Sequence, residues 1–275
     1  MRVRVSCARS AQLVTHLRLV TRTIFMASIP IKTSAQIEAM RLGGRVLRET
    51  LQTVAAAVRP GISTGELDQI AEQAILKHPG CTPGFKGYHG FPGSLCVSVN
   101  DEVVHGIPSR ERILEDGDIV GLDGGVLYQG LYTDACLTVL VGEVKPEIRH
   151  FVKTTKEALN RAVKQVRSGG RIGDISAIIQ KTLEDQGYSP VVTCTGHGVG
   201  VDLHEAPEIL NAGQKGTGPV MKPGMTLAIE PISAIGKGDV FTRKDGWTIV
   251  TQDHSLSAHF EHTVLVNENG AEILA

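Results

Sequence analysis

A long internal repeat constrains the fold of this chain more than any other feature of its sequence. Two stretches of helical pattern align without a gap at a constant offset of 108 residues, and the matched positions are Val58/Val166, Arg59/Arg167, Gly61/Gly169, Gly65/Gly173, Leu67/Ile175 and Ile70/Ile178. Chance similarity between two helix-turn-helix segments is the alternative. A duplicated half explains the matches more directly, so residues 33–140 and 141–275 are expected to form two similar αβ units around a pseudo-twofold axis.

Each expected unit begins with a pair of helices. Thr33 with Gln36, and Ser63 with Glu66, form capping-box patterns that mark two helix starts. Pro-Gly and Gly-Gly pairs mark the helix ends. Helices are therefore expected over residues 33–59, 63–77, 146–168 and 173–187.

Apolar runs typical of strands lie over residues 95–99, 119–126, 131–141, 226–232 and 258–266. The second and third runs are separated by Tyr128-Gln129-Gly130, which predicts a hairpin and therefore antiparallel pairing. The glycine-rich motifs that bind nucleotide phosphates do not occur, so nucleotide binding has no support. The expected fold class is α/β in the α+β sense, with two pseudo-symmetric halves around a mixed, largely antiparallel sheet.

The first 32 residues differ from the rest and are expected to be an extension that precedes a single catalytic domain over residues 33–275. Arginines are frequent in this stretch and no acidic residue precedes Glu38, which is typical of a transit peptide. The alternative is a start codon assigned too far upstream, with Met26 as the true initiator. The expected location is the cytoplasm, or a mitochondrion or plastid if residues 1–25 are a transit peptide.

The overall charge and the cysteines exclude several classes of protein. Lys+Arg number 28 against 29 Asp+Glu, and this net charge of -1 argues against a dedicated nucleic-acid binder. No apolar run approaches the roughly 20 residues needed to span a bilayer. The 5 cysteines are widely spaced and lack a C-x-x-C pair, so neither a disulfide framework nor a thiolate zinc site is indicated.

Two aspartates interrupt the apolar strands of the predicted hairpin. Asp123 and Asp134 have their midpoint between Tyr128 and Gln129, so the hairpin is expected to bring them directly opposite one another. Opposed residues have Cβ atoms roughly 4.5–5.5 Å apart. Two covered carboxylates at that distance repel unless a proton or a cation lies between them, and a divalent metal ion is the natural solution.

Three further side chains complete a candidate metal site. His197 lies in a glycine-rich segment seven residues before His204, Glu230 ends an apolar strand, and Glu261 is expected mid-strand on the same face as His259 and Thr263. Four carboxylates and one imidazole suit Mn²⁺, Fe²⁺, Co²⁺ or Zn²⁺, and the charge sum favours two ions. Such a pair supports metal-assisted hydrolysis. The predicted ligands are Asp123, Asp134, His197, Glu230 and Glu261.

Residues 33–275 resemble the type I methionine aminopeptidases. The motifs that carry the resemblance lie at residues 96–108, 117–120, 133–134, 196–200, 203–207, 229–231, 245–247 and 261–263, in the family's order and spacing. The resemblance implies the pita-bread fold, whose two pseudo-symmetric halves accommodate the repeat. It also implies removal of the initiator methionine from nascent polypeptides when the next residue is small.

The resemblance further implies a role for each site residue. Asp123 would chelate one ion, Asp134 and Glu261 would bridge, and His197 and Glu230 would complete the other site. Glu230 would also act as the general base and then as the acid. His105 and His204 would form hydrogen bonds to the scissile amide and stabilise its developing charge.

The pocket for the methionine side chain is expected to be apolar and partly aromatic. Its predicted lining is Tyr88, Phe91, Cys96 and Trp247, with Phe85 nearby. Two positions depart from the commonest family pattern, because Phe85 stands where a cysteine is frequent and Leu203 where a phenylalanine often precedes the second histidine. These two positions put the tolerance for the residue after methionine in doubt.

Two other functions remain open at this point. A proline-directed aminopeptidase or dipeptidase of the same fold uses similar ligands, but such enzymes usually carry an additional N-terminal domain. A non-catalytic peptide-binding module would be supported by the loss of a ligand, and none is lost. The expected partners are nascent N-termini, with possible ribosome association, on a monomer that binds neither nucleic acid nor membrane.

Overall fold

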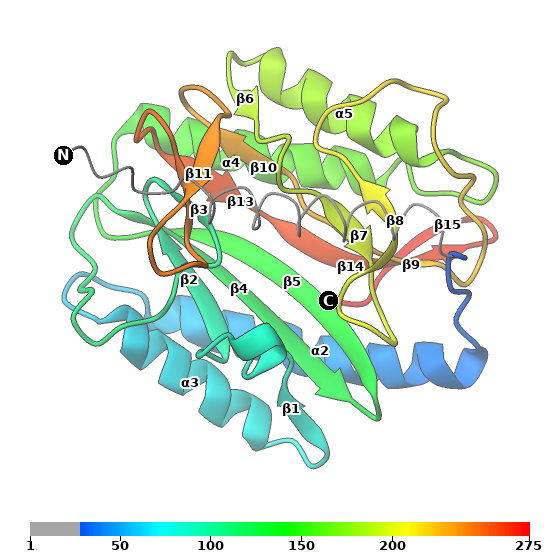
Figure 1. Ribbon diagram of the computed structural model, residues 1–275, viewed down its shortest axis with the longest axis horizontal. Helices are drawn as coiled ribbons and strands as arrows, with labels where there is room; N and C mark the ends of the chain where they lie inside the picture. The colour runs from blue at the N-terminus through cyan, green and yellow to red at the C-terminus, as the bar shows by residue number, and fades with distance from the viewer. Residues whose placement is uncertain (1–27) are drawn as a thin grey trace, which may run out of the picture.

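The computed structural model describes residues 28–275, so the predicted transit peptide and the alternative start at Met26 lie outside the described residues. Two helix pairs flank the strands, with α2 (Ser34–Ala57) and α3 (Thr64–Leu76) on one side and α4 (Pro146–Val163) and α5 (Ile172–Glu184) on the other (Figure 1). Both α3 and α5 have 13 residues, and their bounds differ by the offset of the repeat. The duplication predicted from the sequence is therefore present in the helices.

Both predicted capping boxes form. Thr33 Oγ1 accepts a hydrogen bond from Gln36 N at 3.3 Å, and the Gln36 side chain accepts one from Thr33 N at 2.9 Å. The same exchange joins Ser63 and Glu66. Helix α4 ends at Val163, five residues earlier than expected, because the chain then tightens into turns such as the one closed by Gln165 N and Ala162 O.

The main sheet has nine strands, and the strands of the two halves meet where β5 (Leu131–Leu140) pairs with β14 (Glu261–Asn267). Its central path runs β1-β4-β5-β14-β9-β7-β8, with β2 beside β4 and β15 beside β14. The remaining bounds are β1 (Cys81–Pro83), β2 (Leu95–Val99), β4 (Ile119–Tyr128), β7 (Gly196–Gly198), β8 (Glu205–Ile209), β9 (Thr226–Ile229) and β15 (Gly270–Ile273). Every pairing between the described strands is antiparallel, so the sheet is more uniform than expected.

Two three-stranded sheets and a short 3-10 helix surround the main sheet. One sheet contains β13 (Ser257–His259), β10 (Ile232–Ala234) and β6 (Ser189–Pro190), and the other contains β11 (Val240–Thr242), β12 (Ile249–Thr251) and β3 (Glu102–Val104). The 3-10 helix η1 spans Tyr88–Gly90. Over residues 28–275, the helices are too short or too polar to span a bilayer.

Two strands predicted to be continuous are each broken in the structure. The run over residues 226–232 divides into β9 and β10 at Glu230-Pro231, where proline has no N–H to offer to a neighbouring strand. The run over residues 258–266 divides at Phe260, whose N–H bonds to the carbonyl of Pro231. Glu261 is consequently the first residue of β14, and the prediction of a mid-strand position was wrong.

The hairpin register also differs from the prediction. The turn consists of Gln129 and Gly130, with φ of 50° and 77°, the positive values that a two-residue hairpin turn of type I′ requires. Asp123 therefore pairs with Cys136, and Asp134 pairs with Gly125. The two aspartates are diagonal neighbours on one face, and the expectation that they stand directly opposite was wrong by two positions.

Each helix pair buries its apolar face against its own half of the sheet. Leu67 and Leu122 belong to the core of the first half, and Ile175 and Leu227 belong to the core of the second. Burial of such a side chain contributes roughly 1.5–3 kcal/mol. Because strand side chains alternate, Asp123 points to the face of β4 opposite Val120, Leu122 and Val126, which belong to the core of the first half. The opposite face of the sheet is thereby left for the site.

Candidate active site

The five predicted metal ligands come from five adjacent strands of the main sheet. Along the sheet order, β4 supplies Asp123, β5 supplies Asp134, β14 supplies Glu261, the end of β9 supplies Glu230 and β7 supplies His197. The structure therefore brings together, at the centre of one face, residues that are spread over 139 positions of the chain, from 123 to 261.

Three of the five residues have ligand atoms close enough together to hold one ion. One ligand atom each from Asp134, His197 and Glu261 lie within 4.8 Å of one another. His197 Nε2 is 3.5 Å from Glu230 Oε1, and its Nδ1 lies 2.9 Å from the carbonyl of Gly198. The backbone contact leaves Nε2 directed at the carboxylates, the arrangement seen when a histidine binds a metal through one nitrogen and the protein through the other.

Several polar atoms at this site are buried without a hydrogen-bond partner. Of the seven such side-chain atoms within residues 28–275, four belong here: Asp123 Oδ1, Asp134 Oδ1, Glu261 Oε1 and His259 Nε2. A buried polar atom without a partner is costly. Oxygen donors with one imidazole suit a divalent transition metal ion, so the residues present fit the metal that their chemistry implies.

The pKa values of the site residues also fit a bound metal ion. Burial raises the pKa of Asp123 to about 7. Burial, and then repulsion from the other carboxylates, raises the pKa values of Asp134 and Glu261 well above their usual range. A divalent cation would reverse these shifts because it favours the ionised carboxylates. Burial lowers the pKa of His197 to about 4, which leaves a neutral imidazole able to bind a metal at neutral pH.

His259 is a further member of the site to which the sequence assigned no role. Its Nε2 lies 3.5 Å from Glu230 Oε2 and 3.9 Å from Glu261 Oε2. Two hydrogen bonds with the Thr138 hydroxyl, at 2.8 and 3.0 Å, hold its backbone against β5. Strand alternation placed His259 on the face of Glu261, and that was the available signal. The contact with Glu230 depends on the break between β9 and β10.

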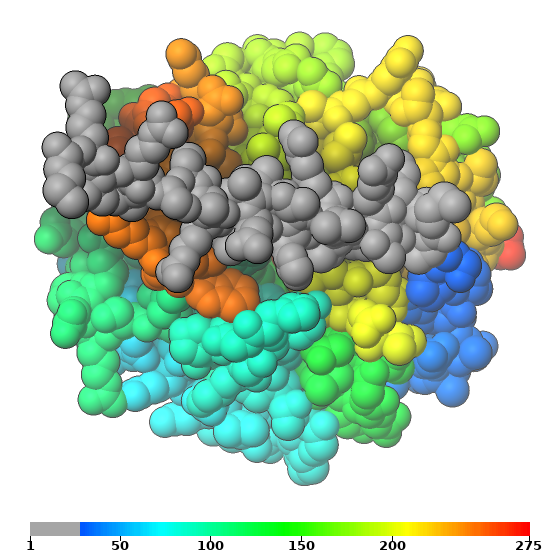
Figure 2. All heavy atoms as spheres, viewed as in Figure 1, coloured from blue at the N-terminus to red at the C-terminus, as the bar shows by residue number. Residues whose placement is uncertain are grey.

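The predicted pocket residues form one apolar cluster beside these ligands. Its buried members are Phe85, Phe91, Cys96 and Leu203, and its partly buried members are Tyr88, Ile107, Tyr132 and Trp247. In Figure 2 the three segments that carry residues 88, 203 and 247, in cyan, yellow and orange, meet on one face of the molecule. The Phe91 and Trp247 rings meet edge to face at 5.2 Å. The sequence did not single out Ile107 or Tyr132 as lining residues.

The two predicted substrate histidines lie at the border between the ligands and this cluster. The ring of His204 is 4.4 Å from that of His197, and its Nδ1 lies 3.2 Å from the Tyr88 hydroxyl. The ring of His105 is 6.4 Å from that of Trp247, and burial lowers its pKa to about 4. A neutral imidazole in this position can donate one hydrogen bond to a substrate carbonyl.

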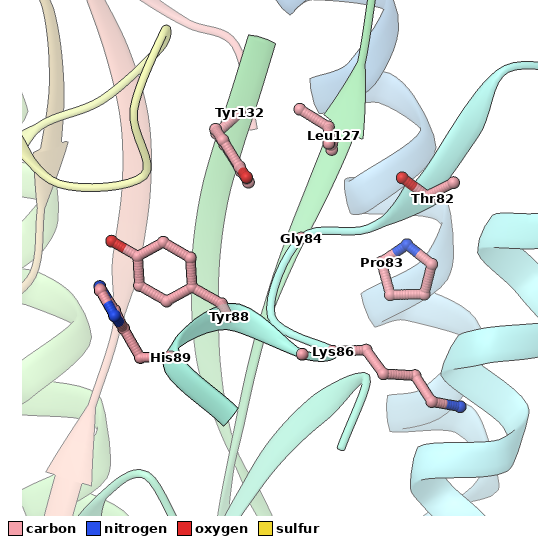
Figure 3. Close-up of a pocket in the computed structure, with 9 residues that line it drawn as sticks. Thr82, Pro83, Gly84, Lys86, Tyr88, His89, Leu127 and Tyr132 are labelled. Carbon is pink, nitrogen blue, oxygen red and sulfur yellow. The ribbon is translucent and has the colours of Figure 1, made fainter. Parts of the chain in front are cut away.

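A cavity of about 560 Å³ adjoins the aromatic cluster and shares Tyr88 and Tyr132 with it. Tyr132 and Leu127 project into it from the hairpin strands, while Tyr88 and Lys86 come from the loop after β1 (Figure 3). The cavity therefore lies beside Tyr88, whose hydroxyl is 3.2 Å from His204 Nδ1.

Comparison with known proteins assigns this arrangement to a family. Residues 38–268 match metallopeptidase family M24. The chain belongs to metallopeptidase family M24. This M24 peptidase is 45% identical over 246 residues to a methionine aminopeptidase of Clostridium acetobutylicum, covering 90% of this chain and 98% of that one.

Solved structures agree with the assignment. The M24 peptidase superposes on methionine aminopeptidase from Thermotoga maritima with a TM-score of 0.88 and 45% identity, over 90% of this chain and 99% of that one. The prolidase of Pyrococcus horikoshii shares the fold, with a TM-score of 0.72 at 21% identity, over 89% of this chain and 62% of the prolidase. The expected pita-bread architecture is thereby confirmed.

Proposed function

We infer that this M24 peptidase is a methionine aminopeptidase, a metal-dependent hydrolase that removes N-terminal methionine from polypeptides. One combination carries the inference: a buried centre of carboxylates and imidazole adjoins an apolar aromatic cluster, in a chain similar to methionine aminopeptidases over nearly its whole length. The centre supplies hydrolytic chemistry, and the cluster suits an unbranched apolar side chain.

The proposed metal ligands are the five residues on adjacent strands. Asp123, Asp134, His197, Glu230 and Glu261 would together hold the ions. The buried oxygens without partners support this assignment. Because four carboxylates formally neutralise two divalent ions, we propose two ions, drawn from cobalt, manganese, iron and zinc.

The proposed mechanism assigns the proton transfers to Glu230. Bound divalent ions would lower the pKa of water and polarise the scissile carbonyl. Glu230 takes a proton from the attacking water and then delivers it to the leaving amine. Its two oxygens face His197 and His259, each 3.5 Å away, and these contacts restrict the carboxylate to one orientation.

The substrate is proposed to be a nascent polypeptide whose second residue is small. Its methionine side chain would enter the cluster of Phe91, Cys96, Trp247 and their neighbours, while His105 and His204 donate hydrogen bonds to the scissile amide. We further propose a monomer in the cytoplasm, or in an organelle if residues 1–25 direct it there, which meets its substrates at the ribosome.

The test is a metal-dependent peptidase assay on the full chain. The protein is stripped with a chelator, and release of the first residue from Met-Ala-Ser and from Xaa-Pro peptides is measured as Mn²⁺, Co²⁺, Fe²⁺ or Zn²⁺ is restored. Titration of bound metal against protein counts the ions. We expect methionine release with two equivalents of metal, and its loss in Glu230→Gln.

The alternatives predict different results in the same assay. Cleavage of Xaa-Pro peptides in place of Met-Ala-Ser would assign this M24 peptidase to proline-directed chemistry. No cleavage with any metal would favour a peptide-binding module. One equivalent of metal at full activity would contradict the two-ion site and leave the substrate assignment intact.

A further inference from the structure

A buried ion pair joins the start of the described chain to the loop that carries His204. Lys32 Nζ bonds Glu205 Oε2, and the two side chains are only 2% and 4% exposed. Lys32 immediately precedes the N-cap of α2, and Glu205 immediately follows His204. Burial removes hydration from both charges, and this cost can exceed the attraction between them. A buried ion pair is therefore weak evidence that the two residues serve only to stabilise the fold.

The second carboxylate oxygen of Glu205 binds the backbone of the loop that carries His204. Glu205 Oε1 accepts hydrogen bonds from the backbone N–H groups of Val201 at 2.6 Å and Asp202 at 3.1 Å. Both donors belong to exposed residues, and no strand pairing covers residues 201–204. One carboxylate, whose charge Lys32 neutralises, therefore holds the backbone of residues 201 and 202 in the segment between the two site histidines, 197 and 204.

The Lys32 side chain also explains why a glycine is required at position 200, in the motif at residues 196–200. A Cβ at Gly200 would collide with Lys32 Cε, so any larger residue there would displace the lysine. The carbonyl of Gly200 accepts a hydrogen bond from Tyr132 N at 2.7 Å, two residues before Asp134 on β5. The loop is thus fixed on one side by Lys32 and on the other by a strand that carries a metal ligand.

Lys32 itself is anchored to the strands of the site. Its N–H bonds to the carbonyl of Gly224 at 2.8 Å, and Gly224 N bonds in turn to Val266 O at 3.0 Å. Gly224 lies just before β9, and Val266 lies on β14. Glu205 is therefore tied to the same framework that carries Glu230 and Glu261.

We propose that Lys32 is a positioning residue, which acts through Glu205 to place the imidazole of His204 against the substrate amide. This inference rests on the proposed function for the role of His204 and adds a residue outside the predicted catalytic domain. The working unit then begins no later than Lys32, one residue before the boundary predicted at 33, and any processing of the N-terminus must leave this lysine in place.

The first test is a double-mutant cycle on the full chain, measured as kcat and KM for Met-Ala-Ser. A displacement of about 1 Å can lower a rate about 100-fold, and we expect a loss of this order in kcat for Lys32→Met. In a His204→Ala background the same substitution should cost less than about twofold, since the positioned group is gone. In a His105→Ala background, the matched control, the full loss should remain.

The second test needs no activity and so separates this inference from the proposed function. Hydrogen exchange of the Val201 and Asp202 amides should become at least about tenfold faster in Lys32→Met, while that of Val264 in the core should not change. Failure of the wild-type protein to release methionine would refute the proposed function, whereas slow exchange of both loop amides in Lys32→Met would refute the positioning role.

A third variant guards against misfolding caused by an unpaired buried carboxylate. Lys32→Met/Glu205→Gln removes both charges and keeps an acceptor oxygen for the two loop N–H groups. This double variant should fold and should recover most of the kcat that Lys32→Met loses. An equal kinetic loss for Lys32→Met in the His204→Ala and His105→Ala backgrounds would show that Lys32 has only a general structural role.

Discussion

In the N-terminal half of the sheet, β4 and β5 have ten residues each and are joined by a two-residue turn, whereas β7, β9 and β14 of the C-terminal half have three, four and seven residues. Helices α3 and α5, which cover the two halves, have 13 residues each, whereas α2 has 24 residues and α4 has 18. The long regular hairpin presents two short aspartates. The interrupted strands present longer glutamates and the imidazole of His197, and the loop between β7 and β8 presents His204. A duplicated scaffold has therefore diverged in its strands more than in its helices.

This difference has a physical basis in how each kind of strand directs its side chains. A continuous ladder fixes the direction of every side chain, so a short carboxylate can reach the centre only from a suitable register. A strand that ends at the site frees the following residues to converge, as Glu230 does before Pro231. The continuous β4–β5 hairpin thus holds its two aspartates in fixed directions, whereas the strand break after β9 allows Glu230 to turn toward them.

The largest expected effect tests whether both halves contribute equally at the substrate amide. His105 comes from the first half and His204 from the second, so His105→Ala and His204→Ala should each lower kcat about 10²- to 10³-fold, the loss typical for one donor to a developing oxyanion. Metal content should stay at the wild-type level in both variants, since neither residue is a proposed ligand. A loss of kcat in only one of the two variants would contradict the proposal that both histidines bind the scissile amide.

Matched core truncations test whether the two helix pairs are energetically equivalent. Leu67 and Ile175 occupy corresponding repeat positions, and both are fully buried. Leu67→Ala and Ile175→Ala should each lower the free energy of unfolding by about 2–5 kcal/mol, from lost burial and the cavity that remains. Urea unfolding of metal-free protein measures both. Two separate transitions would show that the halves unfold independently.

The pH dependence of the metal-free protein should have opposite signs in the two halves. The pKa of Asp123 is raised to about 7 by burial, so the folded state binds the proton more tightly. Its contribution is fully present below about pH 4 and is lost as the pH rises toward 7. The wild type should therefore lose stability relative to Asp123→Asn over this range.

His197 of the second half should show the reverse. Burial lowers its pKa to about 4, so the unfolded state binds the proton more tightly. Its contribution is present above about pH 6.5 and is lost as the pH falls toward 4. The wild type should gain stability relative to His197→Asn as the pH rises between these values. Parallel curves for wild type and variant in either comparison would contradict the corresponding assignment.

The smallest expected effect on stability is at the N-caps of α3 and α5, where the two repeat units have different residues. Ser63 caps α3, and the corresponding position before α5 is Arg171, whose side chain donates to the carbonyl of Gly218 and makes no cap bond. Only the Asp174 side chain caps α5, by accepting a hydrogen bond from Arg171 N at 3.0 Å. Ser63→Ala should lower the free energy of unfolding by about 1 kcal/mol. Arg171→Ala should cost less, because no cap is lost. Thermal unfolding compares the two, and equal losses would show that the arginine stabilises α5 in another way.

Local signals predicted much of the fold and of the candidate site. The capping boxes at Thr33 and Ser63 form as expected because they involve residues three apart in the chain. The pattern of buried polar residues predicted the five ligands, the resemblance predicted most of the pocket, and the structure brings those side chains together. The hairpin register was wrong because it depends on which two residues form the turn. His259 received no role because its partner Glu230 is distant in sequence.

The sequence by itself determined the duplicated architecture, the helix starts and the residue types that gather at the site, because these follow from periodicity, short-range hydrogen bonds and the chemistry of each side chain. Tertiary structure decided the strand breaks at Pro231 and Phe260, the diagonal placement of the two aspartates, and the burial of Lys32 against Glu205. Each of these depends on which groups the folded chain brings together and in what geometry, and this information is not contained in the linear pattern of residue types.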